Sequence, residues 1–204
     1  MIALALVVFG FLLGSVPAGV LVSSLFFRKD LRAAGSGNIG AANAMRTLGR
    51  GAGAAVLLLD AAKGFIPTIV AHSVAGLPLA LAAGFAAIVG HCYSPWLRFK
   101  GGKGVATELG VLFALSWQAA LIFMGIWGLV VAAAGYASVG SLSASLLSAL
   151  TLWVFVDVRA AIYGACAALL IVWRHRENLQ RLREGRENRL IGASSSASNP
   201  GPTP

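Results

Sequence analysis

The sequence predicts an all-α integral membrane protein, built as a bundle of seven transmembrane helices. Of its 204 residues, 58% are hydrophobic and only 11% are charged, and the mean hydropathy is +0.81. This composition lies outside the range of soluble domains. Crossing a bilayer takes about 20 apolar residues, and long apolar runs alternate here with short polar segments. The basic residues gather in those polar segments, which indicates how many times the chain crosses.

The apolar runs give the seven expected helices in order. The first run follows Met1 without a basic leader or a convincing cleavage site, so we expect a transmembrane helix and not a removed signal peptide. Turns are expected near residues 75–78, near Trp117 and near Asp157. The fourth and fifth runs are short for a bilayer, which favours tilted helices or a turn inside the bundle. The expected ranges are 2–27, 51–73, 79–97, 104–117, 119–136, 141–157 and 160–174.

Charge placement predicts the orientation of the bundle. Fourteen of the sixteen basic residues lie in three clusters, at 28–50, 98–103 and 174–189, and only Lys63 and Arg159 fall outside them. Cytoplasmic loops of membrane proteins carry an excess of lysine and arginine. If the three clusters share the cytoplasmic face, the N-terminus lies outside and the C-terminus lies in the cytoplasm.

A single transmembrane domain is expected over residues 1–190. From 191 to 204 the composition changes to small and polar residues without charge, which predicts a disordered tail. Contacts with anionic membrane lipids account for the net charge of +9, so no nucleic-acid partner is expected. Cys92 and Cys166 lie in apolar runs at no metal-binding spacing, and we expect neither a metal nor a cofactor.

The segment from Arg98 to Thr107 carries the strongest chemical signal. Its sequence, RFKGGKGVAT, places three cations and three glycines between two apolar runs. Glycine lets backbone N–H groups approach a ligand, and lysine and arginine pair with phosphate. The segment therefore predicts a binding site for a phosphorylated substrate at the membrane surface. The alternative is a positively charged loop that only sets the topology.

Two nucleotide-binding motifs match in letters but not in context. Residues 35–40 fit the pattern GxGxxG, yet a buried strand does not precede them, which excludes a dinucleotide site. The central glycine loop resembles a phosphate-binding P-loop, but Gly104 follows Lys103 where a serine or threonine would hold magnesium. An ATPase is therefore excluded.

Four further polar segments are expected to reach the same face as the glycine loop. Asp60 and Lys63 share a helix face, and because a charge at the bilayer centre costs about 2.5–3.5 kcal/mol, this pair should face the interior. Whether the pair is catalytic or purely structural stays open, as it does for His91. The other three segments are 35–46, 136–141 and 175–187. Their alternatives to a functional role are, in that order, an ordinary loop, a helix end whose hydroxyls bond to backbone carbonyls, and a solvated amphipathic tail.

Together these segments resemble one family over about residues 10–190, the bacterial acyl-phosphate:glycerol-3-phosphate acyltransferases. The matching motifs are GSVP at 14–17, GSGNxGxxN at 35–43 with Arg46, DxxKG at 60–64, GH at 90–91, FKGGKGVAT at 99–107 and HRxNxxRLxxGxE at 175–187. The resemblance implies a seven-helix, multi-pass protein of the bacterial inner membrane with its active site facing the cytoplasm. It also implies that acyl phosphate donates a fatty acyl group to the 1-hydroxyl of glycerol 3-phosphate. The products are lysophosphatidate and inorganic phosphate, in the first acylation step of phospholipid synthesis.

The resemblance also implies the site residues. Five catalytic residues are expected to hold glycerol 3-phosphate or to line the gap between the two substrates. They are Ser36, Arg46, Lys103, His175 and Asn178. The glycine loop, with Thr107 and Ser138 or Ser141, is expected to cradle acyl phosphate. Further binding residues are expected to be Asn38, Gly40, Asn43, Asp60, Lys63, His91, Lys100, Gly101, Gly102, Gly104, Arg181 and Glu187.

The general base is not fixed by the sequence. Glycerolipid acyltransferases that use thioesters carry an aspartate five residues after a histidine, whereas Leu77, Trp96 and Gln180 occupy those positions here. Because a mixed anhydride has a good leaving group, we expect a phosphate oxygen of the donor to take the hydroxyl proton. His175 is the alternative base. An enzyme that forms acyl phosphate is an expected upstream partner.

Two other functional classes compete with this interpretation. A small anion transporter would use Asp60, Lys63 and the glycine breaks along a midplane path. A membrane scaffold would need no paired anion sites. Against the transporter, the basic motifs concentrate on one face and no inverted repeat is visible.

The charge clusters generate a prediction about topology. An impermeant thiol reagent should label a cysteine placed at Met1 from outside intact cells, and one placed at Gly192 only from the cytoplasmic face. The unsubstituted chain, with its two native cysteines, supplies the background signal. Labelling of both positions from the same side would require an even number of spans and contradict the seven-helix bundle.

Overall fold

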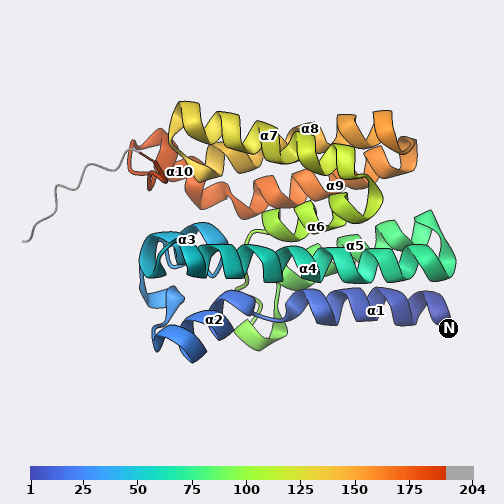
Figure 1. Cartoon of the computed structure of the whole chain (residues 1–204), viewed down its shortest axis with the longest axis horizontal. Coiled ribbons are helices and arrows are strands. Elements are labelled where there is room, and N and C mark those ends of the chain that lie inside the picture. The colour runs from blue at the N-terminus through green and yellow to red at the C-terminus, as the bar shows by residue number, and fades with distance from the viewer. Residues whose placement is uncertain (192–204) are drawn as a thin grey trace, which may run out of the picture.

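The computed structural model describes residues 1–191, and across this range the chain is helical without strands. The long helices run side by side along one axis (Figure 1). They are α1 (Ile2–Ser15), α2 (Ala18–Phe27), α3 (Ala41–Leu48), α4 (Arg50–Ala75), α5 (Leu77–Cys92), α6 (Val105–Leu115), α7 (Trp117–Ala134), α8 (Ala137–Phe155), α9 (Val158–Arg174) and α10 (Arg176–Arg183), with short 3₁₀ turns at Leu31–Ala33 and Pro95–Leu97. Residues 192–204, most of the tail predicted to be disordered, lie outside the described range.

The first expected helix, 2–27, is broken in its middle. Val16 and Pro17 separate α1 from α2, because proline lacks an N–H group and its ring clashes with the preceding turn. The Val16 carbonyl at this break accepts a hydrogen bond from the N–H of Ala18 and another, at 2.7 Å, from Nζ of Lys63 on α4. The two halves together remain one candidate membrane span.

The expectation of seven full spans is confirmed only in part. Within residues 1–191, five segments are long and apolar enough to cross a membrane, and α9 with α10 forms a sixth if this pair, bent by 56°, is counted as one. The run expected at 104–117 shortens to α6, whose 11 residues extend only about 16 Å at 1.5 Å per residue. The protein is therefore a multi-pass bundle of five or six apolar spans.

A buried carboxylate holds the short helix α6 in the bundle. Glu108 is fully buried and accepts hydrogen bonds from the hydroxyls of Ser145, at 2.5 Å, and Ser148, at 3.0 Å, on α8. Because buried polar groups are costly without partners, these two bonds stabilise the contact between α6 and α8. Sequence analysis overlooked Glu108, which stands alone inside an apolar run.

Two expected helix starts, at 119 and 160, were wrong by two residues because a capping side chain lies directly before each helix. Asp157 is the N-cap of α9, and its carboxylate accepts a hydrogen bond from the backbone N–H of Ala160 at 2.9 Å. Ser116 caps α7 in the same way through the N–H of Ala119. A cap lets a helix begin directly after a polar residue, so α9 starts at Val158 and α7 at Trp117.

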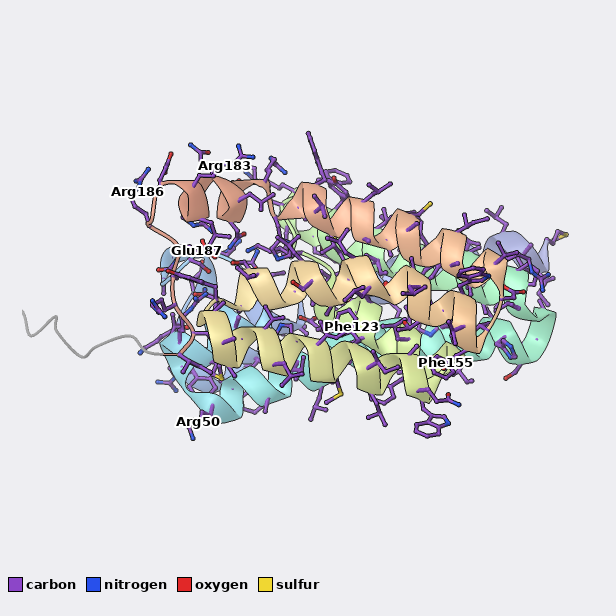
Figure 2. All side chains as sticks on the ribbon, turned by 90° about the horizontal axis from the view of Figure 1, so that it is seen from above. Arg50, Phe123, Phe155, Arg183, Arg186 and Glu187 are labelled. Atoms are coloured by element: carbon purple, nitrogen blue, oxygen red, sulfur yellow. The ribbon has the colours of Figure 1, made fainter. Side chains whose placement is uncertain are left out.

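The charged ends of the helices gather at one end of the bundle. The N-terminus lies at the end of the bundle opposite to α3 and α10 (Figure 1). Arg50, Arg183, Arg186 and Glu187 all lie toward the same end of the bundle, whereas Phe155 lies toward the other (Figure 2). The basic clusters that follow the first span and the last span therefore share one end of the molecule.

Glycines allow α4 and α6 to cross in backbone contact. A Cβ atom at Gly64 would overlap the Thr107 carbonyl, and one at Gly110 would overlap the Ala61 carbonyl. Small residues permit such close approach between membrane helices, where packing drives association. This crossing fixes the start of α6 beside α4, and the functional residues lie around it.

The crossing predicts a stability difference between two mid-helix glycines. Gly110→Ala should destabilise the protein by about 1–3 kcal/mol, because the backbones must separate to admit a methyl group. Gly128→Ala on α7 is the matched control, since nothing lies within 4 Å of its added Cβ. Unfolding of the two variants in detergent micelles checks this. A Gly110→Ala variant as stable as Gly128→Ala would contradict the tight crossing.

Candidate active site

A cavity of about 260 Å³ opens among α3, α4, α6, α7, α8 and the C-terminal segment. Its polar wall is built from α3 and the loop before it, the end of the glycine loop, the start of α8 and the residues after α9. Its apolar wall is formed by Leu57, Leu109, Phe123, Met124 and Trp127. The cavity therefore joins a charged compartment to an apolar one.

Asn43 organises the loop that precedes α3. Its Nδ2 lies 2.8–3.1 Å from the carbonyl oxygens of Leu31, Ala34 and Asn38, and its Oδ1 accepts a hydrogen bond from the N–H of Ser36 at 2.9 Å. Asn43 is buried, so these bonds replace water. Its role is to hold Ser36 and the loop against α3.

Arg46, on α3, presents part of its guanidinium to the cavity. Nη2 donates to the Ser36 hydroxyl at 3.4 Å and Nη1 donates to the Asn188 carbonyl at 3.2 Å. Within the described residues, Nε is buried without a partner. A guanidinium has five N–H groups, so Arg46 retains donors for an anion. Its half-buried position strengthens such a contact, because water competes less.

The glycine loop is folded back onto the end of α5. The N–H groups of Gly101 and Gly102 donate to the carbonyls of Cys92 and His91 at 3.1 and 3.0 Å. Their own carbonyls accept hydrogen bonds from the guanidinium of Arg174, on α9, at 3.0 and 3.1 Å. These two N–H groups are therefore used within the protein, contrary to the expectation that they bind a ligand.

The open N-terminus of α6 borders the cavity instead. Gly104 adopts a positive φ of 91° before α6, and Gly104, Val105 and Ala106 line the cavity. The first N–H groups of a helix have no partner inside it, and they attract anions. Lys103 stands directly beside this helix start, so a cation and a helix N-terminus meet at one place.

A hydrogen-bonded chain links Lys103 to the C-terminal segment. Nζ of Lys103 donates to Oδ1 of Asn178, and Nδ2 of Asn178 donates to Oε1 of Glu187. Glu187 also accepts from Ser138, at 2.9 Å, and from Arg181, at 2.8 Å. The chain thus ties the glycine loop, α10 and the start of α8 together around the cavity.

The two charged ends of this chain have shifted pKa values. Burial lowers the pKa of Lys103 to about 8, against the opposing attraction of Glu187. Burial opposes ionisation of Glu187, but hydrogen bonds from Asn178, Ser138 and Arg181 outweigh it and lower the pKa of Glu187. At neutral pH, Lys103 is therefore a cation with little competing water, and Glu187 is a carboxylate.

His175 stands at the break between α9 and α10. Its Nδ1 lies 2.8 Å from the Ile171 carbonyl, which can only accept a hydrogen bond, so Nδ1 carries the proton. Burial lowers the pKa of His175 to about 4, so the ring is neutral at pH 7. The lone pair is then on Nε2, and a neutral imidazole of this tautomer can accept a proton.

The structure brings most of the expected site residues to the cavity. Those that line it are Ser36, Asn38, Gly40, Asn43, Arg46, Asp60, His91, Lys103, Gly104, Ser138, Ser141, His175, Asn178 and Glu187. Those outside its wall are Lys63, Lys100, Gly101, Gly102, Thr107 and Arg181. Lys100 is exposed, Thr107 is fully buried, and Arg181 reaches the site only through Glu187.

Sequence analysis missed two groups of site residues. Arg174 had been assigned only to a topology-setting cluster, although its position next to His175 was a usable signal for a role at the site. The apolar wall had no signal, because Leu57, Phe123 and Trp127 resemble any other residues of apolar membrane helices. Only the packing of α4, α6 and α7 brings them together.

Comparisons with known proteins identify the family. A family model described as glycerol-3-phosphate acyltransferase matches residues 4–185. The glycerol-3-phosphate acyltransferase of Nitrobacter winogradskyi is 46% identical over 92% of this chain and 95% of its own length, and that of Rhodopseudomonas palustris strain HaA2 is 42% identical over 93% and 96%.

Solved structures give the same result. The crystal structure of PlsY (YgiH), an integral membrane glycerol 3-phosphate acyltransferase, in its glycerol 3-phosphate form is 41% identical and superposes with a TM-score of 0.88, over 93% of this chain and 96% of that one. Its lysophosphatidic acid form is 39% identical, with a TM-score of 0.86, over 93% and 95%. The chain therefore belongs to the glycerol-3-phosphate acyltransferase family.

Proposed function

We propose that the protein transfers a fatty acyl group from acyl phosphate to the 1-hydroxyl of sn-glycerol 3-phosphate. The products are lysophosphatidate and inorganic phosphate. One observation supports the proposal: the same cavity joins two cations, Arg46 and Lys103, and the N-terminus of α6 to an apolar wall. The names of the relatives and the two substrate-related forms of the solved neighbour support it. The charged end of the bundle is proposed to face the cytoplasm of the bacterial inner membrane.

Two phosphates need two sets of donors. We assign glycerol 3-phosphate to Arg46 and Ser36, whose guanidinium and hydroxyl already lie together. The phosphate of the donor is assigned to Lys103 and the N-terminus of α6. Two like charges a few ångströms apart repel strongly at low effective dielectric, and a cation beside each phosphate offsets that repulsion.

The apolar wall is assigned to the acyl chain. Phe123 is almost fully buried, whereas Leu57 and Met124 are 40% and 47% exposed. We assign this exposed edge to the lipid side, so that the wall opens toward the bilayer. Burying the chain yields about 0.8 kcal/mol per CH₂ relative to water, but far less relative to lipid. The wall therefore orients the chain more than it binds it.

The reaction is a transfer of the acyl carbon between two oxygens. The substrate 1-hydroxyl attacks the acyl carbon, the bond to the phosphate oxygen breaks, and inorganic phosphate leaves with the electron pair. A donor phosphate oxygen takes the hydroxyl proton, and Nε2 of His175 is the alternative acceptor. The protein contributes positioning and charge neutralisation, which together can supply most of the acceleration.

The contacts favour acyl transfer over anion transport. A transporter would need a cation free at the bilayer midplane, but Lys63 is buried, hydrogen-bonded to the Val16 carbonyl and to His91, and ion-paired with Asp60. The cavity lies at the charged end of the bundle and continues into an apolar wall. A small anion would gain no favourable contact from an apolar wall, whereas an acyl chain could pack against it.

Donor choice tests the proposal directly. Purified protein should acylate glycerol 3-phosphate with acyl phosphate, without added metal or nucleotide, while releasing inorganic phosphate. Acyl-CoA should be a poor donor, because no phosphate adjoins its thioester carbonyl to occupy the start of α6. Inorganic phosphate should inhibit by binding there. Efficient turnover with acyl-CoA, or strict dependence on magnesium, would contradict the mechanism.

Substitution of the two cavity cations tests the phosphate assignments. Arg46→Lys and Lys103→Ala should each lower turnover at least about tenfold, because each loses a bidentate or charge-assisted contact. Arg50→Lys and Lys29→Ala are matched controls, because both residues are exposed and lie outside the cavity wall. Steady-state kinetics on folded, membrane-inserted protein gives the comparison. If the cavity variants were as active as the controls, the glycine loop would serve only to set the topology.

A further inference from the structure

Three ionisable side chains form a buried cluster directly beneath the glycine loop. Asp60 and Lys63 come from α4 and His91 from α5, and their exposed fractions are only 2%, 5% and 4%. Nζ of Lys63 lies 2.7 Å from Oδ1 of Asp60 and 3.1 Å from Nδ1 of His91. Asp60 and His91 border the cavity, whereas Lys63 lies behind them.

Lys63 is engaged inside the protein by two hydrogen bonds and one ion pair. An ammonium group carries three N–H donors and no acceptor. Its three partners are Oδ1 of Asp60, Nδ1 of His91 and the Val16 carbonyl at the break between α1 and α2. All three are acceptors inside the protein. Lys63 also lies outside the cavity wall, so we assign it a supporting role behind Asp60 and His91.

The contact with Lys63 determines which nitrogen of His91 carries the proton. Because the ammonium can only donate, Nδ1 must accept, and the proton of the neutral ring is then on Nε2. A doubly protonated ring would set two donors against each other. Within the described residues Nε2 has no hydrogen-bond partner, and a Cβ at Gly102 would overlap it. The ring thus stands at the cavity wall beside Lys103, with one donor unused.

We propose that Lys63 is a positioning residue that fixes His91 as an Nε2–H donor to a phosphoryl oxygen bound at the start of α6. This inference rests on the proposed function for the identity of the natural ligand, but its geometry does not. Asp60 neutralises Lys63, so that His91 supplies a neutral hydrogen bond beside the cationic Lys103. Any side chain at position 102 would collide with the ring of His91. This explains why position 102 is a glycine although its N–H already bonds within the protein.

The histidine tautomer can be observed without catalysis. The chain has three histidines, so a protein labelled with ¹³C- and ¹⁵N-histidine in detergent micelles gives few signals, assigned through His72→Gln and His91→Gln. We expect His91 in the Nε2–H form, with a resonance that shifts on addition of inorganic phosphate. Lys63→Met should produce a tautomer mixture, whereas Lys29→Met should not. A wild-type Nδ1–H form, or an unchanged tautomer in Lys63→Met, would overturn the proposal.

Two substitutions of His91 separate its two nitrogens. Asparagine retains an acceptor near Nδ1 for Lys63 but loses the Nε2–H donor, whereas glutamine retains a donor near Nε2 but loses the acceptor. Both remove the ring from beneath Gly102. If the donor matters, His91→Asn should raise the KM for acyl phosphate at least about tenfold, and His91→Gln should recover most of that loss.

The kinetic result has a clear contrary outcome. Equal KM values in His91→Asn and His91→Gln, in variants that unfold at the wild-type temperature, would show that the ring acts only through packing. Wild-type protein inactive with acyl phosphate would refute the proposed function, while the response of His91 to inorganic phosphate would still decide the inference.

Discussion

The site depends on one buried carboxylate, Glu187, which holds together segments that are distant in the sequence. It accepts hydrogen bonds from Ser138, Asn178 and Arg181, which belong to α8 and α10. Through Asn178 it also fixes Lys103 in the glycine loop. With water largely excluded, each of these bonds is stronger than at a surface, but each partner is also costlier to lose. The charged wall of the cavity is therefore a cooperative unit.

Some cations of the bundle bond to groups within the protein, whereas others border the cavity. Lys63 is engaged by two hydrogen bonds and an ion pair, and Arg174 donates to two carbonyls of the glycine loop. Arg46 and Lys103 instead border the cavity, and Nε of Arg46 is unpaired within the described residues. Arg174 holds the glycine loop, Lys63 holds Asp60 and His91, and under the proposed function the second pair is left for phosphate.

Sequence reasoning succeeded where the signal was local and failed where geometry decided. Hydropathy found the apolar runs and the motifs found the polar wall, since each is written in consecutive residues. The predicted length of α6 was too great, because the apolar character of residues 104–117 does not reveal where a short helix ends. Sequence reasoning could not show that the N–H groups of Gly101 and Gly102 bond to α5, because this follows from how the loop folds back, or that Leu57 and Trp127 share a wall, because this follows from how distant helices pack.

Under the proposed function, the exposed edge of the apolar wall, at Leu57 and Met124, would let the two substrates reach the site from different phases. Glycerol 3-phosphate arrives by three-dimensional diffusion from water, whereas an acyl donor that partitions into lipid arrives by lateral diffusion in two dimensions. Its effective concentration is then a mole fraction of the membrane and not a bulk molarity. Surplus bilayer lipid would dilute the donor at constant total amount. The lysophospholipid product would leave along the same edge, already in the phase where later steps of lipid synthesis need it.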